Sequence, residues 1–502
     1  MLKVSSLFTD GAVLCRRKEI RVFGEVKEGV TVTAVLRDAN GYILAEGEDV
    51  GRQGRFLILL PPQEARTGCT LTVSAGGETA EARDVAIGEV FLAGGQSNME
   101  LELRNASGGR DALETHEDSL LRFFNVPRKA YVSPDQRKAM DETRWRAIAP
   151  GSGGENSAVA YFFARKLRER NPEIPVGIIG CYWGGTSITC WLEEETLRET
   201  AEGTRYLDRY AKACGRKSMK TYLQEEATFQ QTLAEWNGKV EAYRSLHPDA
   251  TWEKISDACG LCPWNPPAGP GSPYRPGGLA VSMVHEIVPV TLTAILYYQG
   301  EEDADKTERY DLLMIELIRR WRALFREATL PFLFVQLPMW LDFGASDTFC
   351  WPRLRLAQAA ARDAMRNTGM VCLLDQGEYG NIHPVDKKPV GDRLAELAGR
   401  MLYGEGAVSP RAIAKSTQGN TLTVTLDAPV LTRDGKAPAL LEVAEAEGEF
   451  VPADASLSGN TLRLWAKAVK HPVRARYAWT DYSDQVNLFG ENGLPLEPFL
   501  LG

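Results

Sequence analysis

The chain has 502 residues, of which 44% are hydrophobic and 25% are charged, and its 67 acidic and 58 basic residues give a formal charge of −9. These values are typical of a water-soluble globular protein of about three domains, and they exclude a disordered, collagen-like or coiled-coil chain. Because the charge is negative and no basic block occurs, we expect neither nucleic acid nor an anionic membrane surface as a partner.

The sequence carries no pattern typical of a membrane anchor or an export signal. Its longest apolar run, residues 289–298, is shorter than the roughly 20 residues that a membrane-spanning helix needs. The first residues lack both the apolar run and the small-residue cleavage site of a signal peptide. We therefore expect a cytoplasmic protein, and the removal of an upstream signal stays open.

The nine cysteines do not form a disulfide framework. Their number is odd and their spacing is wide, which favours reduced core residues. Cys259 and Cys262 form one close pair, but no further zinc ligands follow at a comparable spacing. We expect no metal and no cofactor.

Residues 1–85 contain short apolar runs, such as EIRVFGEV, VTVTAVL and RFLILLPP, separated by Gly, Pro-Pro and Asp-Ala-Asn-Gly. Short strands at intervals of about ten residues with turn signals between them are typical of small all-β domains. The pattern predicts a β-sandwich domain over residues 1–85.

From residue 86 to residue 405, apolar strands alternate with amphipathic helical stretches. The expected strands include VFLAG, VGIIGC, TAILYYQG, FLFVQLP and MVCLLD. One helix is expected to begin after Asn156 and Ser157 and to end before Asn171 and Pro172. Because this alternation is typical of a parallel sheet with crossover helices, we predict an α/β catalytic domain over residues 86–405.

Two further segments have their own patterns. A long amphipathic run between Arg216 and His247 leads into the connector CPWNPPAGPGSPYRPGG, so we predict a helical insertion at about residues 200–275. Pro lacks a backbone donor and Gly is flexible, so this connector should lie on the surface or line a cleft, as one wall of the active site. Short strand-like pieces such as TLTVTLDAPV and TLRLWAK predict a small β domain over residues 406–502.

The first candidate functional residue follows the strand VFLAG, at the sheet edge where open α/β proteins bind ligands. After Gly95 and Gln96, Ser97 falls at the expected start of a helix. Backbone amides and the helix dipole stabilise a developing anion at such a place, which suits a nucleophile. A plain N-cap role for Ser97 is equally compatible with this segment.

Two more strands end in small or polar residues. VGIIGCYW runs into Gly184 and Gly185, whose unobstructed amides are natural oxyanion donors. AILYY is followed by Gln299 and by acidic residues at positions 301–303. We interpret the acidic residues as solvated rather than metal-binding, because no His or Cys lies beside them.

A nucleophilic serine needs a base, and the chain has five histidines. His383 follows the strand MVCLL and precedes a helix expected from about Pro389 to Tyr403, so it lies in a strand-end loop, as Ser97 does. The others lie in charged, helical or terminal segments: His116, His247, His285 and His471. His383 is therefore the candidate base.

Four blocks of the sequence, taken together, resemble one enzyme family. They are Gly95-Gln96-Ser97-Asn98-Met99, Trp183-Gly184-Gly185-Thr186, Tyr298-Gln299-Gly300-Glu301, and Ile382-His383-Pro384 with Lys387, Gly391 and Arg393-Leu394-Ala395. In order and spacing the blocks resemble the sialate O-acetylesterase-like carbohydrate esterases of the SGNH, or GDSL-type, hydrolase superfamily. Further similarity at residues 7–14 and 494–499 extends the resemblance over nearly the whole chain.

The resemblance implies an α/β fold with a flavodoxin-like SGNH core, in which Ser97 is the nucleophile and His383 is the general base. It also implies an oxyanion hole built from the amide of Ser97, an amide of Gly184 or Gly185, and the side chain of Gln299. Four more residues are expected to brace the nucleophile turn or border the substrate: Gln96, Asn98, Trp183 and Glu301.

The chain departs from the family at the triad acid. Family members commonly carry an acidic residue two or three positions before the histidine, where this chain has Asn381 and Gly380. Three outcomes stay open: Asn381 orients His383 through its side-chain oxygen, a carboxylate arrives from another direction, or the enzyme is slow or inactive. The candidate carboxylates are Asp375, Glu301 and Glu378.

We therefore expect a metal-independent serine esterase that removes O-acetyl groups from carbohydrates through an acetyl-enzyme intermediate. Acetylated sialic acid and acetylated xylan-type oligosaccharides both fit the resemblance as substrates. The alternatives are a carbohydrate-binding pseudoenzyme and a serine hydrolase of another short acyl ester. The sequence does not fix the acetyl position or the oligomeric state, and it is compatible with a homo-oligomer.

Overall fold

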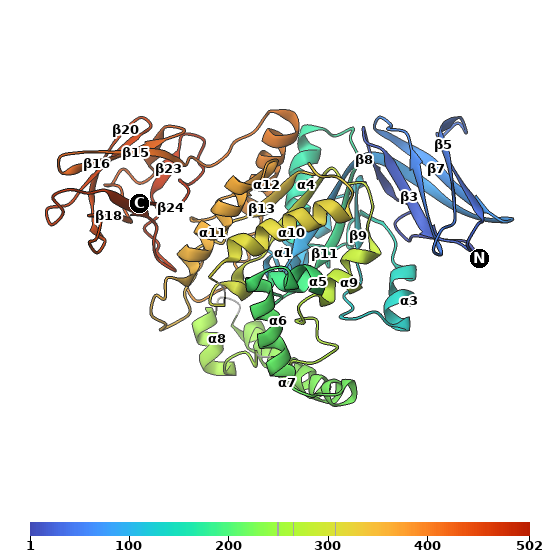
Figure 1. The fold of residues 1–502 in the computed structure, drawn as a ribbon, viewed down its shortest axis with the longest axis horizontal. Helices are drawn as coiled ribbons and strands as arrows, with labels where there is room; N and C mark the ends of the chain where they lie inside the picture. Colours follow the sequence, from blue (N-terminus) through green and yellow to red (C-terminus); the bar gives the residue numbers. More distant parts are fainter. Residues whose placement is uncertain (248–249, 265, 307) are drawn as a thin grey trace.

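The computed structural model describes residues 1–247, 250–264, 266–306 and 308–502. Figure 1 shows a central α/β body with β-rich parts at its two ends, formed by the N-terminal and the C-terminal residues. No helix within the described ranges is long and apolar enough to cross a membrane.

The N-terminal strands form two layers. One is an antiparallel sheet of three strands, and the other joins the first half of the long strand β8 (Glu78–Gly95). The shorter strands are β1 (Lys3–Val4), β2 (Val13–Cys15), β3 (Ile20–Glu25), β4 (Thr31–Arg37), β5 (Ile43–Val50), β6 (Arg55–Leu60) and β7 (Arg66–Ala75). The predicted boundary between residues 85 and 86 falls inside β8, which passes unbroken from this layer into the central sheet.

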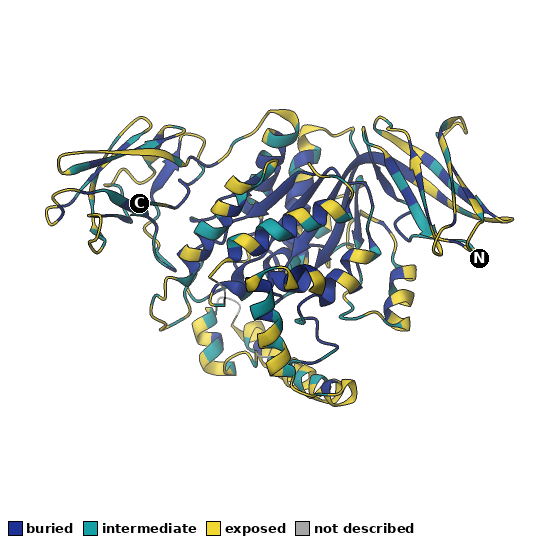
Figure 2. Cartoon of the chain, viewed as in Figure 1, coloured by how far each residue is buried: buried dark blue, intermediate teal, exposed yellow. Residues whose placement is uncertain are grey.

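The central sheet has the strand order β10-β9-β11-β8-β12-β13-β14, and along this order every pair except β10 with β9 is parallel. Its further strands are β9 (Asp118–Asn125), β10 (Arg146–Ile148), β11 (Val176–Tyr182), β12 (Ala294–Tyr298), β13 (Phe332–Val335) and β14 (Thr368–Val371). β11 to β14 are almost entirely buried, which is why they read as continuous apolar runs (Figure 2). The predicted α/β class is confirmed, with a sheet that is mixed because β10 and the N-terminal strand β7 add antiparallel pairs to its parallel centre.

Helices cover this sheet (Figure 1). They include α4 (Ala158–Arg170), α10 (Tyr310–Leu324), α11 (Cys350–Ala364) and α12 (Lys388–Ala398). Other helices of this part of the chain are α2 (Gly109–Thr115), α3 (Pro134–Glu142), α5 (Glu194–Arg198) and α9 (Gly278–Ser282). The start of α4 is as predicted: the Ser157 hydroxyl accepts a hydrogen bond from the amide of Ala160 at 3.1 Å, and the helix ends before Asn171.

The strand order explains where a ligand can bind. β8 lies between β11 and β12, so the chain leaves β8 first toward one side of the sheet and later toward the other. At such a switch point the carboxyl ends of the strands open onto one crevice. The residues that directly follow these three strands are Gln96, Trp183 and Gln299.

The predicted insertion contains three helices that project from the central body: α6 (Ala201–Cys214), α7 (Met219–Leu246) and α8 (Trp252–Cys259) (Figure 1). α7 is mostly exposed (Figure 2). Of the connector that follows, Asn265 lies outside the described residues.

The C-terminal strands have a hydrophobic cluster of their own, which also takes in Met339, Cys372 and Leu374 from the central body. The strands are β15 (Ala412–Gln418), β16 (Thr421–Leu426), β17 (Val430–Thr432), β18 (Leu441–Ala444), β19 (Val451–Pro452), β20 (Asp454–Ser458), β21 (Thr461–Trp465), β22 (Arg474–Tyr477), β23 (Leu488–Gly490) and β24 (Phe499–Leu501). The N-terminal strands, in contrast, share one continuous cluster with the central sheet. The domain boundary at residues 405 and 406 stays a prediction.

Candidate active site

Ser97 is the first residue of the short helix α1 (Ser97–Glu100), directly after β8. The turn before it needs glycine: Gly95 has φ +133°, and a Cβ there would lie 2.1 Å from the carbonyl oxygen of Tyr298. Gln96, not Ser97, is the N-cap residue of α1. The N-cap alternative for Ser97 is therefore wrong, and its hydroxyl group is turned to another partner.

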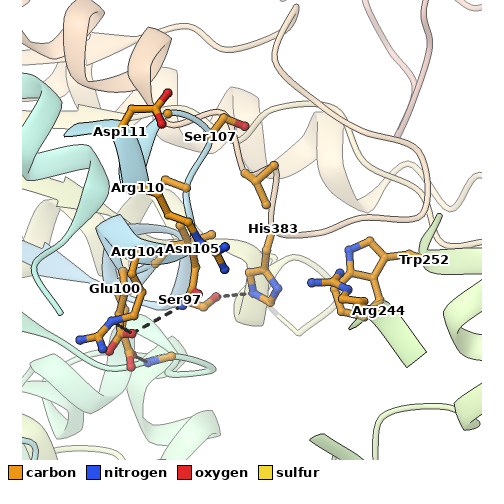
Figure 3. Close-up of a pocket in the computed structure, with 16 residues that line it drawn as sticks. Ser97, Glu100, Arg104, Asn105, Ser107, Arg110, Asp111, Arg244, Trp252 and His383 are labelled. Atoms are coloured by element: carbon orange, nitrogen blue, oxygen red, sulfur yellow. Dashed lines mark hydrogen bonds and ion pairs between the residues drawn. The ribbon is translucent and has the colours of Figure 1, made fainter. Parts of the chain in front are cut away.

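That partner is His383, whose Nε2 lies 2.8 Å from the Oγ of Ser97 (Figure 3). β14 is the far edge strand of the sheet, so the loop 372–387 must cross the ends of β13 and β12 to bring His383 to this position. Burial and the positive charge of Lys387 lower the pKa of His383 from 6.5 to about 4. The imidazole is therefore neutral near pH 7 and able to accept a proton from Ser97.

Asn381 does not orient the imidazole ring. Its Oδ1 accepts a hydrogen bond from the backbone amide of His383 at 3.0 Å, and its Nδ2 donates to Glu378 at 2.7 Å. These two contacts hold the backbone of the loop before His383, and neither of them reaches the imidazole ring. The proposed use of the Asn381 oxygen as a triad member is wrong.

The candidate carboxylates have other partners as well. Asp375 forms a two-pronged ion pair with Arg393, with both distances 2.7 Å. Glu301 accepts from Asn98, and Glu378 from Asn381. Within the described ranges, no carboxylate hydrogen bond to the ring of His383 is present, so Ser97 and His383 form a two-residue contact without a third, acidic member.

Gln96 and Gln299 bind each other behind the nucleophile. Gln299 Nε2 donates to Gln96 Oε1 at 3.1 Å, to the Thr186 carbonyl at 3.1 Å and to Asp303 at 2.6 Å. Because Gln299 is 1% exposed and its amide hydrogens are engaged, the prediction that it donates to an oxyanion is wrong. Gln96, 2% exposed, does not border the substrate either.

Asn98 is fully buried beside the nucleophile. Its Nδ2 donates to Glu301 at 2.6 Å and to the Ile382 carbonyl at 3.0 Å, and its Oδ1 accepts from Lys387 Nζ at 2.5 Å. These contacts tie the segments after β8, β12 and β14 together. Asn98 and Glu301 therefore brace the site from behind, and their predicted contact with substrate is wrong.

The sequence analysis interpreted the acidic residues after β12 as solvated, and this is wrong for Glu301 and Asp303, which are buried, whereas Glu302 is partly exposed. Asp303 is fully buried and accepts hydrogen bonds from Ser187 Oγ at 2.7 Å, the Ile188 amide at 2.8 Å and Tyr206 OH at 2.8 Å. Asp303 thus joins β12 to the segment after β11 and to α6. It is a structural residue that the sequence analysis missed.

Gly184 lies next to the nucleophile: a Cβ on it would be 3.3 Å from the Cβ of Ser97. Its amide currently donates to the carboxylate of Glu100, which also forms an ion pair with Arg128. The predicted oxyanion donor therefore lies beside Ser97, with its amide bound to the side chain of Glu100 in this structure. Gly185 is covered by Trp264, whose ring would lie 2.3 Å from a Cβ on Gly185.

A cavity of about 770 Å³ opens in front of Ser97 and His383. Arg104, Arg110 and Glu100 line it near Ser97, and Arg244 and Trp252 lie beyond His383 (Figure 3). The predicted wall from the Pro/Gly-rich connector is wrong, because α7 and α8 supply these last two residues. Trp183, half-buried against the core, does not line the cavity, so its predicted contact with substrate is wrong too.

Arg244 lies over the ring of Trp252, with its guanidinium carbon 4.3 Å from the ring centroid. This stacked pair holds an aromatic face and a positive charge at the cavity. Neither residue was a candidate from sequence. The amphipathic pattern predicted the helices but did not indicate which of their exposed residues would face the nucleophile.

Known proteins are similar to the part of the chain that contains Ser97 and His383. Residues 87–242 and 264–396 match the family model described as carbohydrate esterase, sialic acid-specific acetylesterase. Sialate O-acetylesterases of Rattus norvegicus and Homo sapiens are 26% and 25% identical over 95% of this chain, and the matches cover 90% and 88% of those proteins. A novel carbohydrate acetylesterase from Xanthomonas citri has a similar crystal structure, with 28% identity, a TM-score of 0.77 and coverage of 100% of both chains.

Proposed function

The chain belongs to the sialic acid-specific acetylesterase family of carbohydrate esterases, and on this premise we propose that it is a serine O-acetylesterase whose central sheet is an SGNH-type core. The observation that carries the proposal is the 2.8 Å contact between Ser97 Oγ and His383 Nε2 at the cavity. A serine hydroxyl in contact with a neutral imidazole is the arrangement that acyl transfer requires.

In the proposed reaction, Ser97 Oγ attacks the acetyl carbonyl carbon while His383 Nε2 takes the hydroxyl proton. The resulting tetrahedral oxyanion accepts hydrogen bonds from the amides of Ser97 and Gly184. As the intermediate collapses, the bond to the sugar oxygen breaks and His383 returns its proton to that oxygen. Water, activated by the same imidazole, then hydrolyses the acetyl-enzyme to acetate and regenerates Ser97.

Glu100 must release the amide of Gly184 before an oxyanion can bind there. Its carboxylate keeps Arg128 as a partner, and Arg128 is half exposed, so the pair can turn away together toward solvent. The resting arrangement protects the donor with an anion that an incoming acetyl group displaces. We propose Ser97 and Gly184 as the oxyanion donors, without Gln299.

The dyad has a kinetic consequence. In a triad the carboxylate fixes the imidazole tautomer and stabilises the imidazolium that forms when the serine proton is taken. His383 has no such partner within the part of the chain that the structure describes. We therefore expect a working esterase that turns over more slowly than a triad enzyme of the same architecture.

The substrate is proposed to be an O-acetylated saccharide, with acetylated sialic acid as the first candidate. Trp252 offers an aromatic face for a sugar ring. Arg110 and Arg244 have no ion pair within the described ranges and supply positive charge on two sides of the cavity, which suits the carboxylate of a sialic acid. Acetylated xylo-oligosaccharides, which lack this charge, are the comparison substrate.

The test is acetate release by wild type, Ser97→Ala and His383→Ala from 4-nitrophenyl acetate, O-acetylated sialic acid and an acetylated xylo-oligosaccharide. We expect release by wild type and loss of at least about a thousandfold in both variants. Glycan binding by wild type without any acetate release would support the pseudoenzyme instead. A preference for butyryl or longer nitrophenyl esters would favour a different acyl hydrolase.

A further inference from the structure

A buried lysine lies behind the dyad, and the reaction described above gives it no role. Lys387 is 1% exposed and stands at the N-cap of α12. Its Nζ donates to Asn98 Oδ1 at 2.5 Å and lies 5.6 Å from the centroid of the Tyr298 ring. The ammonium group is therefore held between the nucleophile segment and the end of β12.

Asn98 connects Lys387 to the segments that carry both members of the dyad. It directly follows Ser97 in the chain, and its Nδ2 donates to the carbonyl of Ile382, the residue before His383. The second hydrogen of the same amide goes to Glu301. The three contacts of the Asn98 side chain therefore join the nucleophile segment to the loop that carries His383, through Ile382 and Lys387, and to the segment after β12, through Glu301.

Keeping a charge at this place is costly. Burial lowers the pKa of Lys387 from 10.5 to about 8, although Glu301 and Glu378 favour its charged form. Burial also raises the pKa of Glu301, whose Oε2 has no hydrogen-bond partner among the described residues. An apolar residue would fill the space without this penalty, and such perturbed buried groups cluster at functional sites.

We propose that Lys387 is a positioning residue of the dyad: by holding Asn98, it fixes the Ser97 turn and the His383 loop relative to each other. In a triad, the carboxylate on the imidazole does part of this work. Here the restraint acts on the backbone of both segments. The inference rests on the proposed function, because it assigns Lys387 a part in the same dyad.

The charge of Lys387 gives this role a signature in pH. It lowers the pKa of His383, so its removal should raise that pKa. Other charged groups surround the imidazole and stay unchanged in a Lys387 variant. Those that line the cavity are Glu100, Glu102, Arg104, Arg110, Asp111 and Arg244, and those that act on Lys387 are Glu301, Glu378 and Asp386.

Three variants separate hydrogen bonding from charge and from general damage. Lys387→Met removes both the donor and the charge, Lys387→Gln keeps a donor for Asn98 without the charge, and Lys388→Met changes an exposed neighbour that pairs with Asp392. We expect Lys387→Met to lower kcat at least about tenfold with little change in KM. Lys387→Gln should recover most of that loss, and Lys388→Met should match wild type.

Two further readouts do not depend on acetate release. Labelling of Ser97 by an organophosphate, followed by mass spectrometry, should slow in Lys387→Met and recover in Lys387→Gln. NMR titration of the His383 ring protons should give a higher pKa in both Lys387 variants than in wild type. The double variant Lys387→Met with Asn98→Leu should lose little more activity than Asn98→Leu alone, because Asn98→Leu already breaks the contact between residues 98 and 387.

The experiments distinguish failure of the Lys387 proposal from failure of the proposed esterase function. If wild type labels at Ser97 but releases no acetate from any ester, the proposed function fails while the labelling rates still test Lys387. If Lys387→Met folds, labels and turns over like wild type with an unchanged His383 pKa, the positioning role is overturned. A further outcome is that Lys387→Met and Lys387→Gln lose kcat equally, with KM and the pKa of His383 unchanged. That result would also overturn the positioning role, because only general structural damage predicts it.

Discussion

The ring of Phe343 fills the space beside Gly380, so that a Cβ on residue 380 would lie 2.0 Å from the Cζ of Phe343. Gly380 also has φ +70°, and its amide donates to the carbonyl of Leu341 at 2.9 Å. One of the two positions where an acid is expected is therefore closed to any side chain. At this position the absence of the acid follows from the packing of two loops, whereas the other position is occupied by the neutral side chain of Asn381.

Introducing the acid at this position should damage the protein. Gly380→Asp combines a left-handed backbone with overpacking against Phe343, and we expect it to lower the free energy of unfolding by about 2–5 kcal/mol and to reduce activity. Urea denaturation and nitrophenyl acetate turnover measure both effects. Gly459→Asp, at φ +58° in open space, should cost only the backbone part, about 1–2 kcal/mol. Recovery in Gly380→Asp with Phe343→Ala would identify the ring as the obstacle, and a stable Gly380→Asp would contradict this explanation.

The enzyme should keep its activity to a lower pH than an enzyme whose catalytic histidine has an ordinary pKa. His383 must be neutral to accept the Ser97 proton, and burial with the charge of Lys387 lowers its pKa to about 4. We expect kcat/KM to stay level as the pH falls to about 5 and to halve near pH 4, rather than near 6.5. The measurement is kcat/KM from pH 3.5 to 8 in a buffer of constant ionic strength. Half-activity at pH 6 or above would show that His383 titrates normally.

The same shift acts on stability, with a defined sign. Since the folded pKa of His383 lies below its unfolded value of 6.5, the unfolded state binds the proton first as the pH falls. Wild type should therefore lose stability relative to His383→Gln between pH 6.5 and 4. Denaturation midpoints of the two proteins across this window test the prediction, and parallel curves would contradict it.

Glu100 should restrain the resting enzyme. Its carboxylate holds the amide of Gly184, the proposed oxyanion donor, so Glu100→Ala should free that donor and raise kcat/KM for nitrophenyl acetate by roughly three- to tenfold. Glu114→Ala, an exposed change on the neighbouring α2, is the matched control. Lower activity in Glu100→Ala would mean that the carboxylate instead keeps the segment after β11 in place.

Trp252 should matter for sugars and not for small esters. As an aromatic wall of the cavity, it is expected to stack on a saccharide, so Trp252→Ala should raise KM for an acetylated saccharide about tenfold and leave nitrophenyl acetate turnover nearly unchanged. Trp236→Ala on α7, whose indole bonds to the Gly260 carbonyl outside the cavity, controls for damage to the insertion. Equal effects of the two variants on both substrates would argue against a sugar contact.

Much of this molecule was determined by local sequence. Apolar runs and glycines decided the strands β8, β11, β12 and β14, because strand and turn preferences act over a few residues. The same short-range logic led to Ser97 and His383, each in a strand-end loop. Both candidates meet in the structure, although they are 286 positions apart in the chain.

Only the tertiary structure decided what the other side chains do. Gln299 and Glu301 follow β12 in a pattern that suits either catalysis or support, and their partners lie more than 200 positions away on Gln96 and Asn98. The hydrogen bond between Lys387 and Asn98 joins residues 289 positions apart, and no periodicity or motif spacing encodes such a contact. Burial then sets the pKa of each group, and burial is a property of the packed chain. The sequence by itself named the candidate nucleophile and the candidate base, whereas the packing of distant loops brings Ser97 and His383 into contact and decides which residues hold them.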